Sequence, residues 1–199
     1  MANLVQIYNL ALAKVGHTKF VAATTDRSVE AELCNVFYEQ CRNQLLREYP
    51  WRFAKRRAAL SILAGTPPTA WQFQYSKPSD CLRARYLANP LGRNVRADLA
   101  VPFEVASVGD QEVIFTDLED AELVYTQLIT DPTRFDALFV IALATLMASE
   151  LALPLRGKPD LTEPLRQGAE ILALRATAAS LNEGHEATPD TEFLGARNG

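Results

Sequence analysis

Apolar residues recur at three- and four-residue intervals near the start of the chain, the period of an α-helix with one buried face. A first helix is predicted from about residue 3 to residue 15, because Asn3 can cap its start and Gly16 can end it. A second is predicted from the segment TTDRS to Pro50, with an apolar stripe at Val29, Leu33, Val36, Phe37, Cys41 and Leu45. The charged residues lie off that stripe, at Glu30, Glu32, Glu39, Arg42 and Arg47.

The last third of the chain predicts two more helices. Asp131 suits the cap of the first, and Pro132 is favoured at the first helical position. Its apolar segment ALFVIALATLMAS, residues 137–149, needs covering on both faces. The second begins near Asp160 or Thr162 and presents a stripe at Leu165, Ala169, Leu172 and Ala176. Residues 182–199 are polar and aperiodic, which predicts a flexible C-terminal tail.

The middle of the chain changes to a period of two. WQFQY, CLRARYL and AELVYTQL alternate or cluster bulky side chains as half-buried strands do. PFEVASVGDQEVIFT predicts a hairpin that turns around Val108, Gly109 and Asp110. Residues 58–129 are therefore expected to form an antiparallel β-meander.

The order of these elements predicts an α+β fold. The apolar third helix needs partners, and the two N-terminal helices are the nearest candidates. We expect a discontinuous helical bundle built from residues 1–57 and 130–181, with residues 58–129 inserted as a β region and residues 182–199 as a tail.

Composition is that of an ordinary globular protein. The 199 residues are 48% hydrophobic and carry a net charge of −4, which does not favour general affinity for nucleic acid or anionic membrane. The thirteen residues 137–149 are fewer than the roughly 20 that a bilayer span needs. The N-terminus lacks the pattern of a signal peptide, so we expect neither a membrane nor a secreted setting.

The residues that usually carry chemistry form no recognisable constellation. Cysteines are odd in number and are interpreted as core residues, at Cys34, Cys41 and Cys81. His17 and His185 lack metal-ligand spacing to Cys, Asp or Glu. The acidic segment at Asp117, Glu119 and Asp120 is typical of a solvated turn. We expect no enzyme, no metal and no cofactor.

The segment YPWRFAKRR allows two interpretations. In the first, Arg52, Lys55, Arg56 and Arg57 contact phosphates while Trp51 or Phe53 stacks on bases, which would make the chain a small nucleic-acid-binding module. In the second, the segment joins a helix to a strand, and the cations stay in water or form ion pairs. The structural residues of that junction would be Tyr49, Pro50, Trp51 and Phe53. The acidic chain favours the second interpretation.

Several segments, in order, resemble the head-to-tail adaptor proteins of short-tailed bacteriophages, also called tail tubular protein A or head completion protein. The likeness runs through LVQIYNLALAKVG, SVEAELCNVFYEQCRNQLLREYPWRFAKRRAAL, PSDCLR and TDPTRFDALFVIALATLMASELA, over about residues 1–180. LLREYPWRFAKRRA is its most specific part.

The resemblance implies a non-catalytic virion protein of the tail or neck, made in the host cytoplasm. It implies a ring, typically dodecameric, that docks beneath the portal protein and receives the tail nozzle or other tail proteins. DNA would pass through the channel without specific binding, and a negatively charged subunit suits that passage because captured phosphates would slow it. It also implies a helical bundle with a β extension.

Within this interpretation, the cations face a neighbouring subunit or the portal. Candidate contacts are Arg52, Lys55, Arg56 and Arg57, together with the apolar anchors Phe193 and Leu194 in the tail. Besides the nucleic-acid-binding module, a generic scaffold or oligomerisation protein outside phages remains an alternative.

Overall fold

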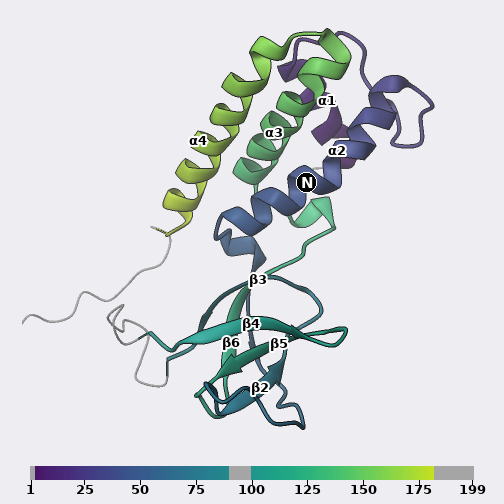
Figure 1. The fold of residues 1–199 in the computed structure, drawn as a ribbon. Coiled ribbons are helices and arrows are strands. Elements are labelled where there is room, and N and C mark those ends of the chain that lie inside the picture. The colour runs from purple at the N-terminus through teal and green to yellow at the C-terminus, as the bar shows by residue number, and fades with distance from the viewer. Residues whose placement is uncertain (1–2, 90–99, 182–199) are drawn as a thin grey trace, which may run out of the picture.

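The computed structural model describes residues 3–89 and 100–181. It shows a mixed α+β fold, with the α-helices gathered in one part and the strands in another (Figure 1). The described helices are α1 (Leu4–Lys14), α2 (Val29–Glu48), α3 (Ala137–Arg156) and α4 (Thr162–Leu181). The predicted tail, residues 182–199, lies outside the described residues.

The two N-terminal helices begin and end where the sequence predicts. Asn3 and Gln6 form a reciprocal capping box at α1, and Gly16 follows the helix with a φ of +73°. Ser28 caps α2, and Tyr49 ends it. The predicted stripe on α2 is wrong in part, because Val29 and Val36 are exposed. The buried face instead carries Ala31, Cys34, Tyr38, Cys41, Arg42, Leu45 and Leu46.

Small residues explain why the buried face of α2 differs from the predicted one. Its buried face approaches α3, whose own buried residues include Ala142, Ala144 and Ala148. Two helices that meet through alanine and cysteine can pack closely, whereas valine on the outer face costs little. Arg42 is also buried, at 4% exposure, and its guanidinium lies 5.3 Å from the centre of the Tyr38 ring.

The start of α3 differs from the prediction. Asp131 caps a short 3-10 turn, Pro132–Arg134, and Asp136 caps α3 by accepting a hydrogen bond from the Leu138 backbone N–H at 2.8 Å. The extended backbone of Phe135 separates the two. Gly157, in the left-handed region, ends α3. The fourth helix starts at Thr162, one of the two predicted positions.

The expectation that the apolar segment is too short for a membrane span is wrong, because α3 has 20 residues and contains an 18-residue window with a mean hydropathy of 2.0. By length and composition it would suffice to cross a bilayer. However, 61% of its apolar window is buried inside the protein. Such burial is what a soluble core helix also shows.

Six described strands form two antiparallel sheets of three strands each. One sheet has the order β1-β6-β3 and the other β2-β5-β4. The strands are β1 (Lys55–Ala59), β2 (Phe73–Ser76), β3 (Cys81–Leu87), β4 (Phe103–Val108), β5 (Gln111–Thr116) and β6 (Glu122–Gln127). Only β4 and β5 are neighbours in both sequence and sheet, so the predicted meander is wrong, although every pairing is antiparallel as expected.

The two main hydrophobic cores correspond to the two parts of the molecule, and a third small cluster at Val15, Ala148 and Ala152 also belongs to the helices. The larger contains buried residues from all four helices, and α3 contacts each of the other three. The smaller lies between strands of both sheets, around Tyr75, Ile114, Leu123 and Tyr125. The chain therefore leaves the helical part after α2, builds the β part, and returns at α3 (Figure 1).

Candidate interaction site at the junction of the helical and β parts

An aromatic cluster lies where α2 gives way to β1. Trp51 is 3% exposed, and its indole N–H donates to the Leu45 carbonyl oxygen at 2.8 Å. Its ring meets that of Phe139 on α3 edge-on, with centroids 4.9 Å apart. Phe53 is half-buried and contacts Phe139 at 5.1 Å between centroids. The two rings are thus packed against α3, and the burial of Trp51 disfavours stacking of a base on it.

The other two residues of the predicted junction mark the end of α2. Tyr49 is half-buried and lies against Trp51 with ring centroids 6.3 Å apart. Pro50 is exposed and follows the last helical residue, Glu48, by two positions. Since proline cannot continue a helix, the chain turns here and enters the 3-10 turn Arg52–Ala54.

The cations of the basic segment lie mainly in β1, which begins at Lys55. Arg56 donates to the Asp80 carboxylate at 3.0 Å, and Arg57 pairs with Glu122 on β6. Lys55 lies over the Tyr86 ring, 5.7 Å from its centre. The hydrogen bond from Arg57 holds the pKa of Glu122 below its usual value. Contacts of these cations with another chain stay a prediction.

Asp80 connects several groups next to β1. Besides Arg56, its oxygens accept hydrogen bonds from the Tyr125 hydroxyl at 2.8 Å and the Gln127 amide at 2.9 Å. Burial and the bond to Asp80 raise the pKa of Tyr125 to about 12. A hollow of about 360 Å³ lies beside Arg56, Asp80 and Tyr125.

Sequence reasoning missed the two arginines that fasten the β part to α2. Arg83 and Arg85 project from β3 toward the last carbonyl groups of α2, where the helix dipole favours a cation. The Nη2 atom of Arg85 donates to carbonyl oxygens of Leu46, Arg47 and Tyr49 at 3.2, 3.0 and 2.7 Å. Partial burial, with a smaller contribution from Arg83, lowers the pKa of Arg85. Alternation in CLRARYL places both on one side of a strand, but their partner lies about 40 residues away.

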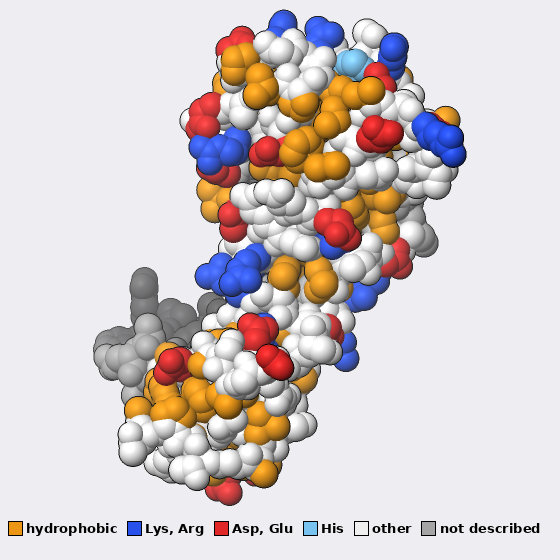
Figure 2. All heavy atoms as spheres, turned by 45° about the vertical axis from the view of Figure 1, so that its right-hand side comes forward, with side chains coloured by type: hydrophobic (Ala, Val, Ile, Leu, Met, Phe, Trp, Pro, Cys, Tyr) orange, Lys and Arg blue, Asp and Glu red, His pale blue; other side chains and the backbone are white. Residues whose placement is uncertain are grey.

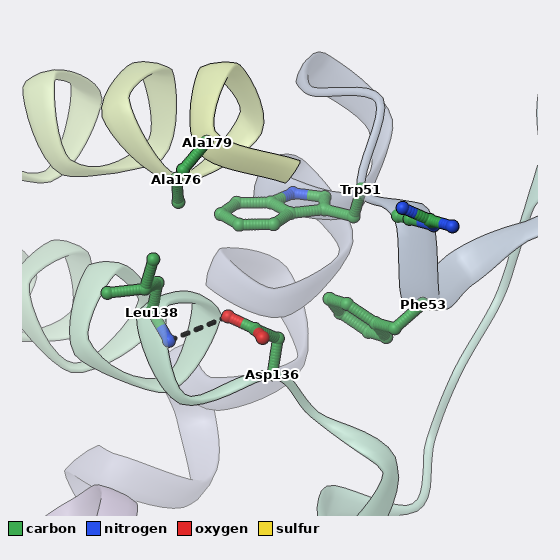
Figure 3. A pocket seen from close by; sticks show the side chains of 7 residues that line it. Trp51, Phe53, Asp136, Leu138, Ala176 and Ala179 are labelled. Atoms are coloured by element: carbon green, nitrogen blue, oxygen red, sulfur yellow. Dashed lines mark hydrogen bonds between the residues drawn. The ribbon is translucent and has the colours of Figure 1, made fainter. Parts of the chain in front are cut away.

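A cavity of about 290 Å³ opens beside the aromatic cluster. Figure 3 shows the Trp51 ring between the end of α4, at Ala176 and Ala179, and the start of α3, at Asp136 and Leu138. Phe53 lies at one side, and Arg52 also lines the space. The lining is mainly apolar, with one cation and one carboxylate.

The cysteine thiols and the His17 imidazole are side chains that could react or bind a metal ion. Burial raises the pKa of Cys34 and Cys41 to about 12 and that of Cys81 to about 11, which suppresses the reactive thiolates. His17 Nε2 lies 2.9 Å from a Glu30 oxygen. Within residues 3–89 and 100–181 no cluster of three His, Cys, Asp or Glu side chains could hold a metal ion.

The acidic turn between β5 and β6 also has a local role. An Asp117 carboxylate oxygen accepts the Gln72 backbone N–H at 3.0 Å, and Asp120 takes a φ of +51°. Asp tolerates that left-handed conformation better than most residues, which accounts for its place at this turn.

No known protein-family profile matches the sequence, and no curated protein matches it. The architecture of the chain, together with this junction, is therefore the basis for a functional proposal. The junction provides a hydrogen-bonded link between the helical and β parts, a row of half-exposed cations along β1 and an apolar cavity. The cations and the cavity suit contacts with other polypeptides.

Proposed function

We propose that the chain is the subunit of a head-to-tail adaptor ring in a short-tailed bacteriophage. The ring docks beneath the portal, receives the tail nozzle or other tail proteins, and lets DNA pass through its channel. The observation that carries this proposal is the discontinuous architecture: helices from both ends of the chain share one core, and a β part projects from it. That is the arrangement implied by the sequence resemblance.

Exposed apolar side chains on two flanks of the helical part support self-assembly. On α4, Ile171 and Leu174 are 49% and 58% exposed, and on α2, Val29 and Val36 are 61% and 66% exposed. Because α3 lies between α2 and α4, these flanks face different directions. Figure 2 shows hydrophobic side chains gathered on the face that lies to the right in Figure 1, where α2 runs.

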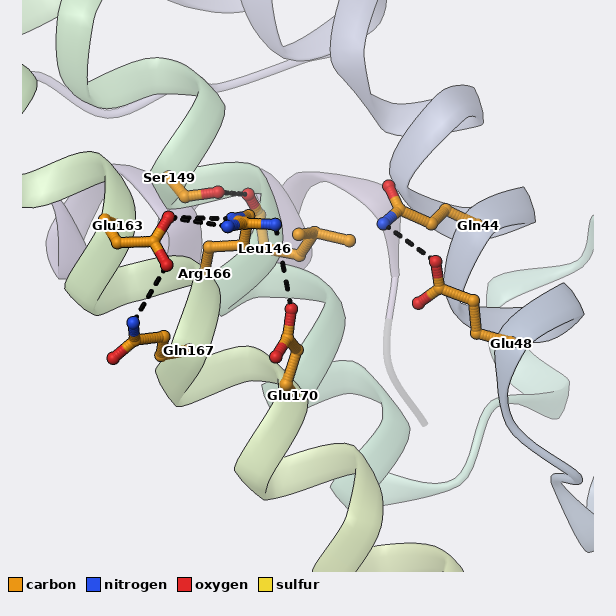
Figure 4. A network of polar contacts seen from close by, with 8 residues as sticks. All are labelled: Gln44, Glu48, Leu146, Ser149, Glu163, Arg166, Gln167 and Glu170. Atoms are coloured by element: carbon orange, nitrogen blue, oxygen red, sulfur yellow. Dashed lines mark hydrogen bonds and ion pairs between the residues drawn. The ribbon is translucent and has the colours of Figure 1, made fainter.

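Two different apolar surfaces, one on α4 and one on α2, suit a ring better than a two-fold dimer. In a cyclic assembly, one patch of each subunit meets a different patch of the next subunit. Polar residues border the α4 flank: Glu163 accepts from Arg166 at 2.7 Å and from Gln167 at 2.8 Å (Figure 4). This network lies toward the start of the helix, and Ile171 and Leu174 continue its exposed face as an apolar patch one turn further on.

The test mixes the purified chain with rings of the portal protein encoded by the same genome and images the product by electron microscopy. The expected result is a second ring stacked beneath the portal. The double variant Ile171→Glu with Leu174→Glu should abolish the stacked ring, because it places charge at the centre of the contact.

A matched control adds the same charge far from both flanks, through Ser107→Glu with Gln111→Glu at exposed positions of β4 and β5. It should assemble as the unmodified chain does. Separate portal rings and free subunits under all conditions would contradict the adaptor proposal itself. A stacked ring formed equally well by the α4 variant would contradict only the assignment of the α4 flank.

A further inference from the structure

The cavity beside Trp51 has the size of amino-acid side chains. Its volume of about 290 Å³ lies at or below the lower end of the roughly 300–1,000 Å³ typical of small-molecule sites. Five lining residues are apolar, namely Trp51, Phe53, Leu138, Ala176 and Ala179. Leu138 is 43% exposed, so an apolar occupant would cover a side chain that now meets water. A pair of apolar side chains from a peptide suits this space.

We infer that the cavity binds Phe193 and Leu194 of the same chain. Ala179 lines the cavity, and α4 ends two residues later at Leu181, so residues 182–199 start within one helical turn of it. Eleven residues, 182–192, precede Phe193. Extended, they would span roughly 36 Å, which is ample for a return to the cavity. Phe193 and Leu194 are the only large apolar residues after Leu181.

Charge favours the same occupant. Residues 182–192 carry four carboxylates and neither lysine nor arginine, at Glu183, Glu186, Asp190 and Glu192. Arg52 lines the cavity and Lys55 begins β1 three residues later, whereas Arg56 and Arg57 already pair with Asp80 and Glu122. Asp136 is the one carboxylate in the lining, and its Oδ1 is already engaged with the Leu138 backbone N–H.

This inference stands apart from the adaptor proposal, since it concerns the isolated chain. Disulfide trapping tests it with Gly195→Cys, next to the two anchors, combined with either Ala179→Cys or Ala178→Cys. Ala178 and Ala179 are adjacent and exposed, but only Ala179 lines the cavity. A tethered segment without a preferred site would have nearly the same effective concentration at both. The native cysteines are buried with raised pKa values and do not compete.

The expected result is faster intramolecular cross-linking at position 179 than at position 178, read as a mobility shift on non-reducing gels. Adding Phe193→Ser and Leu194→Ser should remove that preference. Equal rates at the two positions, or a preference that survives both serines, would overturn the inference. Covalent dimers whose formation depends on protein concentration would overturn it too, by assigning the segment to the cavity of a second copy.

Discussion

Replacing Arg85 by methionine should uncouple the two parts of the molecule. Methionine keeps an unbranched apolar stem but removes the charge and every donor. In the native protein, Arg85 Nε donates to Thr126 Oγ1 at 2.8 Å, while Nη2 reaches carbonyl groups at the end of α2. One side chain thus ties β3, β6 and α2 together.

The expected loss follows from those contacts. A hydrogen bond to a charged group contributes about 1.5–3 kcal/mol net, and a cation at a helix C-terminus about 0.3–1 kcal/mol. The three Nη2 contacts share one nitrogen, so they count as one strong interaction. Arg85 is half-buried, and its desolvation offsets part of the gain, as its lowered pKa indicates. We therefore expect a loss of about 2–4 kcal/mol.

Urea unfolding followed by circular dichroism and by tryptophan emission measures this loss. For a chain of this size, the corresponding drop in melting temperature is about 5–15 °C. Arg83→Met is the comparison, because Arg83 is exposed and its short contact is to the Arg47 carbonyl at 2.8 Å. It should cost less than about 1 kcal/mol. An unchanged midpoint for Arg85→Met, or equal losses for both variants, would refute the assigned role.

Three further outcomes are expected. Trp51→Ala should cost about 3–5 kcal/mol in calorimetry or urea unfolding, because the ring is buried; unchanged stability would contradict that packing. The pKa of Glu30 is lowered below 4.5, chiefly by its hydrogen bond with His17. The unmodified chain should therefore lose stability relative to Glu30→Gln as pH falls below that value, whereas parallel pH profiles would argue against the pair. Thiol reagents at pH 8 should label the three buried cysteines, Cys34, Cys41 and Cys81, only after the protein unfolds. Rapid labelling of the folded protein would show that at least one of these thiols is exposed.

Local signals in the sequence predicted the boundaries of the two N-terminal helices and the start of α4. Asn3, Gly16 and Ser28 act through their nearest neighbours in the chain, so such caps can be recognised without knowledge of the fold. Pairing between strands was not predictable in this way. The apolar composition of AELVYTQL indicates a buried strand, but not that β1 and β3, rather than β5, lie beside it.

At the junction, the sequence predicted the contacts between residues close together in the chain, but not those between distant residues. Aromatic residues on both sides of Pro50 indicated a buried exit from α2, and Trp51 is indeed buried. The partners of Arg56, Arg57 and Arg85 are 24 or more residues distant, and no periodicity encodes such contacts. The prediction for α2 buries the large residues Val29 and Val36, whereas the observed buried face includes the small residues Ala31 and Cys34.

The helical core combines the first two helices with the last two, and this constrains how the chain can fold during synthesis. On the ribosome, α1 and α2 emerge first, yet their principal partner α3 begins only at Ala137. Until then, their apolar faces stay uncovered, while residues 55–127 can complete both sheets from contiguous sequence. Synthesis proceeds at about 5–20 residues per second, so this exposed interval lasts seconds. Chaperone demand during translation should therefore concentrate on residues 4–48, which form α1 and α2.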